Sequence, residues 1–288
     1  MVPRLVMSAW PKPACRCKSG ASRLTMPVLF CLVRGRDVQM PRWMRTQERM
    51  RLFRFFAGMA TAAALAFPAG AERTDSVSFK VYLKGLPIGI LAFNGIEKDG
   101  AYAVAGKLKA TGIVGALLKV GYEAEVRGAV ANGAFVPARY KEIRDDRNGR
   151  RTAWMEYRDG VPGPKRYDPP RKSTSGVIDP ATQKGTVDPL TALYVVLRDQ
   201  DGPDPCDRAL AIFDGKKRAG LRLSPLAASP EEVRCSGEYR RVAGYSAREM
   251  REKPVFPFTI TYRLSGGRWR AERIDTDTIH GRAVLRRR

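Results

Sequence analysis

Few residues in this chain could carry chemistry, and their spacing matches none of the common catalytic sites. His280 is the only histidine among 288 residues, which argues against most histidine-based metal sites and against a nucleophile–histidine–carboxylate triad. The carboxylate pairs Asp145-Asp146 and Asp275-x-Asp277 could serve as acid and base, but such pairs in polar turns are usually solvated. The sequence contains no GxSxG, SxxK, HExxH, P-loop or glycine-rich dinucleotide motif. We therefore expect a protein that is not an enzyme and that uses no cofactor or metal.

The segment from Met50 to Ala71 has the pattern of a secretory signal peptide. Two arginines follow Met50, residues 55–67 form an apolar stretch, and Ala69-Gly70-Ala71 is a small-x-small cleavage site. The apolar stretch is shorter than the roughly twenty residues that a transmembrane helix needs. We therefore expect cleavage near Ala71 and a periplasmic protein without a transmembrane anchor.

A start at Met50 would make residues 1–49 a spurious upstream extension, and we expect this extension to be disordered. It has no helical or strand period that could bury one face. The alternative is a genuine start at Met1, which would make residues 1–49 a targeting arm or a membrane anchor. In either case we expect residues 72–288 to form a single β-barrel-like domain.

The chain is strongly basic, with 52 Lys and Arg against 29 Asp and Glu and a formal net charge of +23. Without its first 71 residues it keeps 40 basic and 27 acidic residues, a net charge near +13. Such a charge can attract anionic lipid head groups or acidic glycans, although charges on solvated faces would give the same composition. A secretory signal argues against nucleic acid as the partner.

Cleavage after Ala71 would leave two cysteines, Cys206 and Cys235. In an oxidising compartment such a pair indicates one disulfide. A crosslink across the 28 intervening residues would stabilise the fold by about 3 to 4 kcal/mol in the chain-entropy account. A metal or redox pair is the alternative, although the sequence has no CxxC motif.

Apolar residues at every second position predict strands along most of residues 72–288. The alternation is clear from Val77 to Leu83 and again from Phe256 to Leu264. Turn signals such as Asp99-Gly100 separate the strands. We expect a mainly β fold of about eleven strands, a curled antiparallel sheet or half-open barrel, because open sheet edges invite aggregation.

One main helix and one long loop interrupt these strands. Asp188 is a good N-cap, Pro189 suits the first helical position, and apolar residues follow at helical spacing. The apolar stripe of this helix must be buried, so we expect the sheet to wrap around it. Residues 159–187 contain five prolines and many basic side chains, which predicts a long, mobile surface loop.

A cavity between the sheet and the helix is our candidate site. The short apolar patch at 113–118 could plug the core, meet a lipid chain or touch a membrane, and aromatic residues could line a cavity or be ordinary core. The candidate residues for the cavity or its lid are Ile113, Val114, Leu117, Leu118, Trp154, Leu193, Tyr194, Leu197, Phe258 and Tyr262.

Four segments, in order along the chain, resemble an exported bacterial family known as domain-of-unknown-function family 3108. They are Tyr82–Gly89, Asp188–Tyr194 with Arg198, Phe213–Arg218, and Cys235–Tyr239 with Val242–Tyr245. The resemblance implies no catalytic residues. It implies a fold similar to spherical β-barrel periplasmic proteins, including envelope-integrity proteins and lipoprotein carriers, whose curved sheet half wraps a helix and can hold an acyl chain.

Two hypotheses about function follow. In the first, the protein is a periplasmic β-barrel that binds a lipid, a lipoprotein or another envelope component. In the second, it is a non-enzymatic envelope-integrity factor that contacts protein or acidic glycan through its basic surface. A cavity of several hundred Å³ with apolar walls would favour the first hypothesis, and a filled interior would favour the second.

Overall fold

The computed structural model describes residues 72–112, 121–146, 149–171 and 175–288. These residues form one antiparallel sheet of fourteen strands, together with two α-helices and a 3-10 helix. The predicted signal peptide and upstream extension lie outside the described residues. So do Ile113, Val114, Leu117 and Leu118 of the predicted lid.

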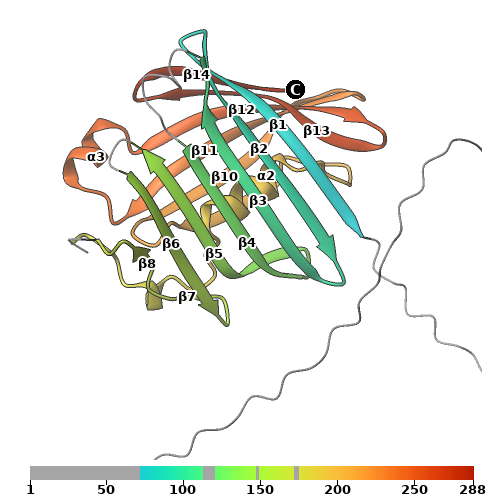
Figure 1. Ribbon diagram of the computed structural model, residues 1–288. Coiled ribbons are helices and arrows are strands. Elements are labelled where there is room, and N and C mark those ends of the chain that lie inside the picture. The colour runs from blue at the N-terminus through green and yellow to red at the C-terminus, as the bar shows by residue number, and fades with distance from the viewer. Residues whose placement is uncertain (1–71, 113–120, 147–148, 172–174) are drawn as a thin grey trace, which may run out of the picture. The chain divides into compact units, whose positions relative to one another are not determined.

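The first half of the sheet contains six long strands that follow one another along the chain (Figure 1). Their bounds are Arg73–Leu83 for β1, Leu86–Lys98 for β2, Ala101–Ala110 for β3, Gly121–Ala131 for β4, Ala134–Asp146 for β5 and Gly149–Arg158 for β6. Each pairs with the next in an antiparallel ladder. Buried and exposed residues alternate along β3 and β6, as the period of two predicts.

The second half of the sheet contains the remaining six long strands. Their bounds are Arg208–Phe213 for β9, Arg218–Ala228 for β10, Glu232–Ala243 for β11, Val255–Ser265 for β12, Arg268–Thr278 for β13 and Gly281–Arg287 for β14. The two halves join where β14 pairs with β1, with Phe79 opposite Arg287 and Leu83 opposite Ala283. The first and last strands therefore meet in the middle of the sheet, not at its edges.

Helix α2, Pro189–Leu197, lies between the two halves and behind β3 and β4 in the view of Figure 1. It starts where the sequence predicts, because the side chain of Asp188 accepts hydrogen bonds from the N–H groups of Leu190 and Thr191, both at 3.0 Å. Glycines make room for it on the sheet. A Cβ at Gly95 would lie 2.3 Å from the Tyr194 ring, and one at Gly106 would lie 2.7 Å from Leu190.

The prediction of a mainly β fold is confirmed, but the predicted numbers of strands and helices are not exact. The sheet has fourteen strands, not about eleven, and there is a second α-helix, α3, at Ala247–Glu252. The sheet curls around α2 without closing: within the described residues no ladder joins its two edges, which are β7 (Val161–Pro162) with β6 at one end and β9 at the other.

The segment from Asp159 to Val187 spans the gap between these two edges. Its described part contains β7, β8 (Arg166–Asp168) and a 3-10 helix at Pro180–Thr182. The N–H of Gly185 donates to the carbonyl of Gly160 at 2.9 Å, and the N–H of Val187 donates to the carbonyl of Ala211 on β9 at 2.8 Å. The segment predicted as a long, mobile surface loop therefore contains short strands of its own, and its backbone pairs with β6 at one edge and with β9 at the other.

Candidate functional site

A pocket of about 420 Å³ lies between α2 and the inner face of the second half of the sheet. Helix α2 lines it with Pro189, Ala192, Leu193, Val196 and Leu197. The sheet lines it with apolar side chains from β2, β9, β10, β12, β13 and β14: Leu91, Ile212, Ala219, Leu221, Phe256, Phe258, Ile260, Ile274 and Leu285. Lining of this kind is typical of sites for apolar ligands.

The spacing of residues on each element explains why these side chains meet. Leu193 and Leu197 are four residues apart and lie on one face of α2, while Phe256, Phe258 and Ile260 alternate along β12 and share its inner face. Leu193, Phe256 and Phe258 are only half-buried, although they point to the interior side of the sheet. These side chains are not fully buried because they border the pocket.

Four polar residues of the pocket, Asp214, Lys217, Tyr239 and Tyr245, lie together at one end, which we call the mouth. Asp214 and Lys217 come from the turn between β9 and β10, and Tyr245 follows β11. The Nζ of Lys217 lies 4.7 Å from the centre of the Tyr245 ring, and the hydroxyls of Tyr239 and Tyr245 are 3.1 Å apart. The site therefore has an apolar body and one polar end.

Helix α3 is held at the mouth by Glu249. Ser246 is the N-cap of α3 and exchanges two hydrogen bonds with Glu249 in a capping box. Glu249 also forms an ion pair with Lys217. The hydrogen bond from Lys217, with that from the backbone of Ser246, lowers the pKa of Glu249 to about 2, so this carboxylate is charged at neutral pH. The Ser246-x-x-Glu249 spacing was the signal that could have predicted α3 from the sequence.

Of the predicted cavity residues that the structure describes, Leu193, Leu197 and Phe258 line the pocket. Tyr194 points away from it, toward β1 and β2, where its hydroxyl lies within hydrogen-bond distance of two carboxylates, 3.0 Å from Asp75 and 2.9 Å from Glu97, and can donate its one proton to either.

The other two predicted cavity residues lie elsewhere. Tyr262 is fully buried beyond the pocket and donates to the carbonyl of Val196 at 2.8 Å. Trp154 lies on the outer face of β6 and lines a separate hollow with Pro162 and Pro164. The structure thus brings only part of the predicted set together.

Cys206 and Cys235 form the predicted disulfide, and both are fully buried. Cys206 precedes β9 and Cys235 lies on β11, so the crosslink connects the start of the edge strand to the second strand inward. It anchors the wall of the sheet that faces α2.

The residues singled out for possible chemistry lie apart from the pocket. The hydrogen bond from Arg273, with Arg282 nearby, lowers the pKa of Asp275 to about 2. His280 is exposed in the turn between β13 and β14. Across the described ranges, no group of three or more His, Cys, Asp or Glu side chains is placed to hold a metal ion, and no helix there is long and apolar enough to cross a membrane.

A family model described as "Protein of unknown function (DUF3108)" matches residues 78–256, which is more than half of the chain. The chain belongs to this family. The DUF3108 match runs from β1 to the start of β12 and includes α2, β9, β10, β11 and α3. Seven residues from three of the segments that carried the resemblance line the pocket: Pro189, Ala192, Leu193, Asp214, Lys217, Tyr239 and Tyr245. Searches of curated proteins and of solved structures found no match to the chain.

Proposed function

We propose that this DUF3108 protein binds an apolar ligand, such as a lipid acyl chain or the lipid of a lipoprotein, between α2 and the sheet, and that it acts by binding and not by catalysis. The observation that carries the proposal is the apolar pocket of about 420 Å³. Protein interiors are normally packed so closely that few voids exceed a water molecule. A hollow of this size with apolar walls therefore favours a guest.

The energetics of such a guest also support binding. Each methylene group that leaves water for an apolar pocket contributes about 0.8 kcal/mol. Leu193, Phe256 and Phe258 are half-buried, so a bound chain would also remove part of their surface from water. Both terms favour ligands with longer chains.

We further propose that the protein works in an exported, oxidising compartment such as the periplasm. Two features support this location: the signal-peptide pattern at residues 50–71, and the disulfide between Cys206 and Cys235, since disulfides persist mainly outside the cytosol. An envelope component is then the most accessible source of an apolar ligand.

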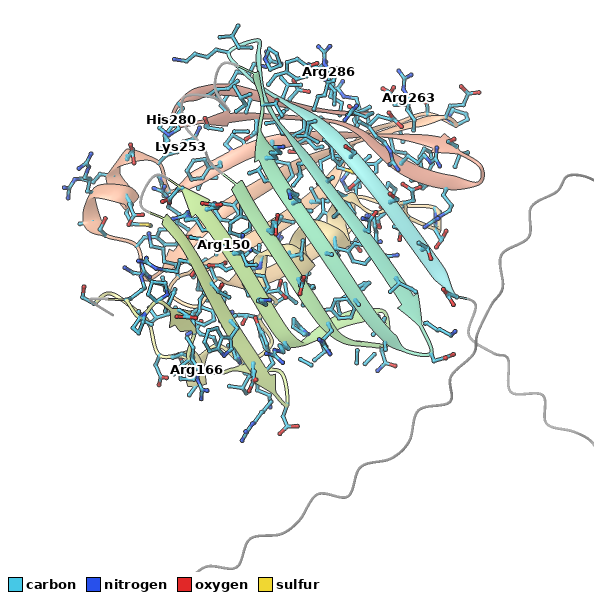
Figure 2. The ribbon with its side chains drawn as sticks, in the orientation of Figure 1. Arg150, Arg166, Lys253, Arg263, His280 and Arg286 are labelled. Carbon is cyan, nitrogen blue, oxygen red and sulfur yellow. A yellow bond between two sulfur atoms is a disulfide. The ribbon has the colours of Figure 1, made fainter. Side chains whose placement is uncertain are left out.

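The alternative function, contact with protein or acidic glycan through the basic surface, has weaker support. Figure 2 labels six basic residues: Arg150 on β6, Arg166 on β8, Lys253 after α3, Arg263 on β12, His280 before β14 and Arg286 on β14. Arg150 and Arg166 lie near one edge of the sheet and the other four lie on or near β12 to β14, so these six residues do not form one docking patch. The open pocket also meets the condition that favours ligand binding over surface contact.

The proposal is tested by native mass spectrometry of the protein isolated from its own cells without detergent. We expect a co-purifying apolar ligand, and a rise in melting temperature when dodecanol is added to delipidated protein. Protein that carries no ligand and shows no thermal shift with dodecanol would argue against the proposal.

A pair of matched variants locates the site. Leu193→Trp should fill the pocket and abolish the thermal shift, because Leu193 lines the pocket on α2. Leu226→Trp makes the same replacement at a side chain that is 55% exposed on β10 and should leave the shift unchanged. Equal shifts in both variants would place dodecanol elsewhere.

A further inference from the structure

A second hollow adjoins the mouth of the apolar pocket. Its volume is about 370 Å³, and it shares Asp214 and Lys217 with the apolar pocket. The two hollows therefore meet at the turn between β9 and β10. We call the second hollow the basic recess, because six basic side chains line it: Arg144, Arg151, Lys165, Arg171, Lys216 and Lys217.

The two carboxylates of the basic recess already have partners. Glu142 accepts hydrogen bonds from two tyrosine hydroxyls and lies 2.8 Å from the Nζ of Lys165. Burial raises the pKa of Glu142, but Lys165 and the tyrosines outweigh burial and hold this pKa below its usual value. The carboxylate of Asp214 accepts from the backbone N–H groups of Lys216 and Lys217, both at 2.7 Å. Together with Glu249, which forms an ion pair with Lys217, these two carboxylates offset three of the six positive charges.

Arg144 and Arg151 are the side chains of the basic recess best placed to hold an anion, and both are exposed. They lie directly opposite each other on β5 and β6, on the face of the sheet that also carries Tyr140 and Met155 and that turns toward the core. Neither arginine forms an ion pair with another residue of the described ranges, and the same holds for the side chain of Lys216.

Like charges directly opposite each other on neighbouring strands repel. An anion between Arg144 and Arg151 would replace this repulsion with two attractions. A guanidinium group can hold a carboxylate or a phosphate through two parallel hydrogen bonds. The basic recess therefore has the geometry and charge of an acidic-group site.

We propose that the ligand is an amphiphile with an acidic head group, either a carboxylate or a phosphate. Its chain lies between α2 and the sheet, and its head lies in the basic recess beside Arg144, Arg151 and Lys216. This inference rests on the proposed function, because the chain in the apolar pocket brings the head to the mouth. Lys217, which lines both hollows, marks the boundary between chain and head.

Titration calorimetry of the full chain with four probes tests the head group. The probes are dodecanol, dodecanoate, dodecyl phosphate and inorganic phosphate, each kept below the concentration at which it aggregates. We expect the two acidic amphiphiles to bind roughly tenfold or more tightly than dodecanol. Added salt should reduce this difference, because it screens the exposed arginines Arg144 and Arg151.

Two double variants that each remove two positive charges test where the head group binds. Arg144→Gln with Arg151→Gln removes two charges from the basic recess. Arg150→Gln with Arg166→Gln removes two charges outside it, from the outer face of β6 and from β8 (Figure 2). Only the first pair should weaken binding of dodecanoate and dodecyl phosphate, by roughly tenfold. Unchanged dodecanol binding would show that both proteins are folded.

Each remaining outcome overturns a specific claim. Equal affinity for dodecanol and the acidic amphiphiles would contradict the claim that the ligand has an acidic head group. So would an equal loss of affinity for the acidic amphiphiles in both double variants. Either result would leave the proposed function standing. If inorganic phosphate binds as tightly as dodecyl phosphate, the claim that the ligand is an amphiphile is contradicted, because the basic recess would then be a site for free anions. Failure of all three amphiphiles to bind would overturn the proposed function itself.

Discussion

At the scale of single residues, the direction in which a side chain points decides its role. Leu193 and Tyr194 are neighbours on α2, yet Leu193 lines the pocket and Tyr194 packs against the first half of the sheet. Successive helical residues point about 100° apart, so helical spacing predicted that Leu193 and Leu197 share a face. The partners of Tyr194, Asp75 and Glu97, are about a hundred residues away along the chain and could not be predicted from local spacing.

Asp188 makes the stability of the protein depend on pH. It is fully buried, and this burial raises its pKa to about 6 although it accepts hydrogen bonds from Thr191 and Leu190. The folded protein therefore holds a proton more tightly than the unfolded chain does. The free energy of unfolding should fall by up to about 3 kcal/mol from this group as pH rises from about 4 to above 6.

The variant Asp188→Asn should lack this component of the pH dependence. Asparagine caps helices about as well as aspartate and does not titrate. Urea unfolding, followed by circular dichroism across this pH range, measures both proteins. Parallel profiles for the wild type and the variant would contradict the assignment to Asp188.

At the scale of elements, the disulfide stabilises the wall of the sheet that faces the pocket. The double variant Cys206→Ala with Cys235→Ala should lose about 3 to 4 kcal/mol of unfolding free energy, because the crosslink restricts the unfolded chain over a separation of 29 residues. Urea denaturation measures the loss. Wild-type protein in reductant is the control and should unfold at the same urea concentration as the variant. A urea midpoint in the variant equal to that of the oxidised wild type would contradict the prediction.

The sequence predicts most long strands and α2, because these elements have local signals. The alternation from Phe256 to Leu264 predicted β12, and Asp188-Pro189 predicted the start of α2. The short strands β7 and β8 have no such signal, because they consist of two and three residues that pair with β6 only when the chain has folded back. The basic recess was missed for the same reason: it combines β5, β6 and the β9–β10 turn.

At the scale of the whole molecule, the fold depends on residues from both ends of the described domain. Strand β14 pairs with β1 in the middle of the sheet, and Leu285 of β14 lines the pocket together with Leu91 of β2. The wall of the pocket therefore includes residues from both the first strands and the last strand. The segment from Asp159 to Val187 then bridges the two remaining edges.

The export proposal makes a prediction about the mature chain. Because Ala69-Gly70-Ala71 matches a cleavage site, protein isolated from its own cells should begin at Glu72. Intact mass measurement and sequencing of the terminal peptide identify this end. A terminus upstream of Met50 would contradict the proposal.

The most direct test of ligand binding between α2 and the sheet is photolabelling of the full chain with a dodecanoate that carries a diazirine at the end of its chain. We predict crosslinks in the peptides of α2 and β12, near Leu193 and Phe258, and competition by unlabelled dodecanoate. Crosslinks at exposed apolar residues such as Leu86 and Leu226, without competition, would contradict the account.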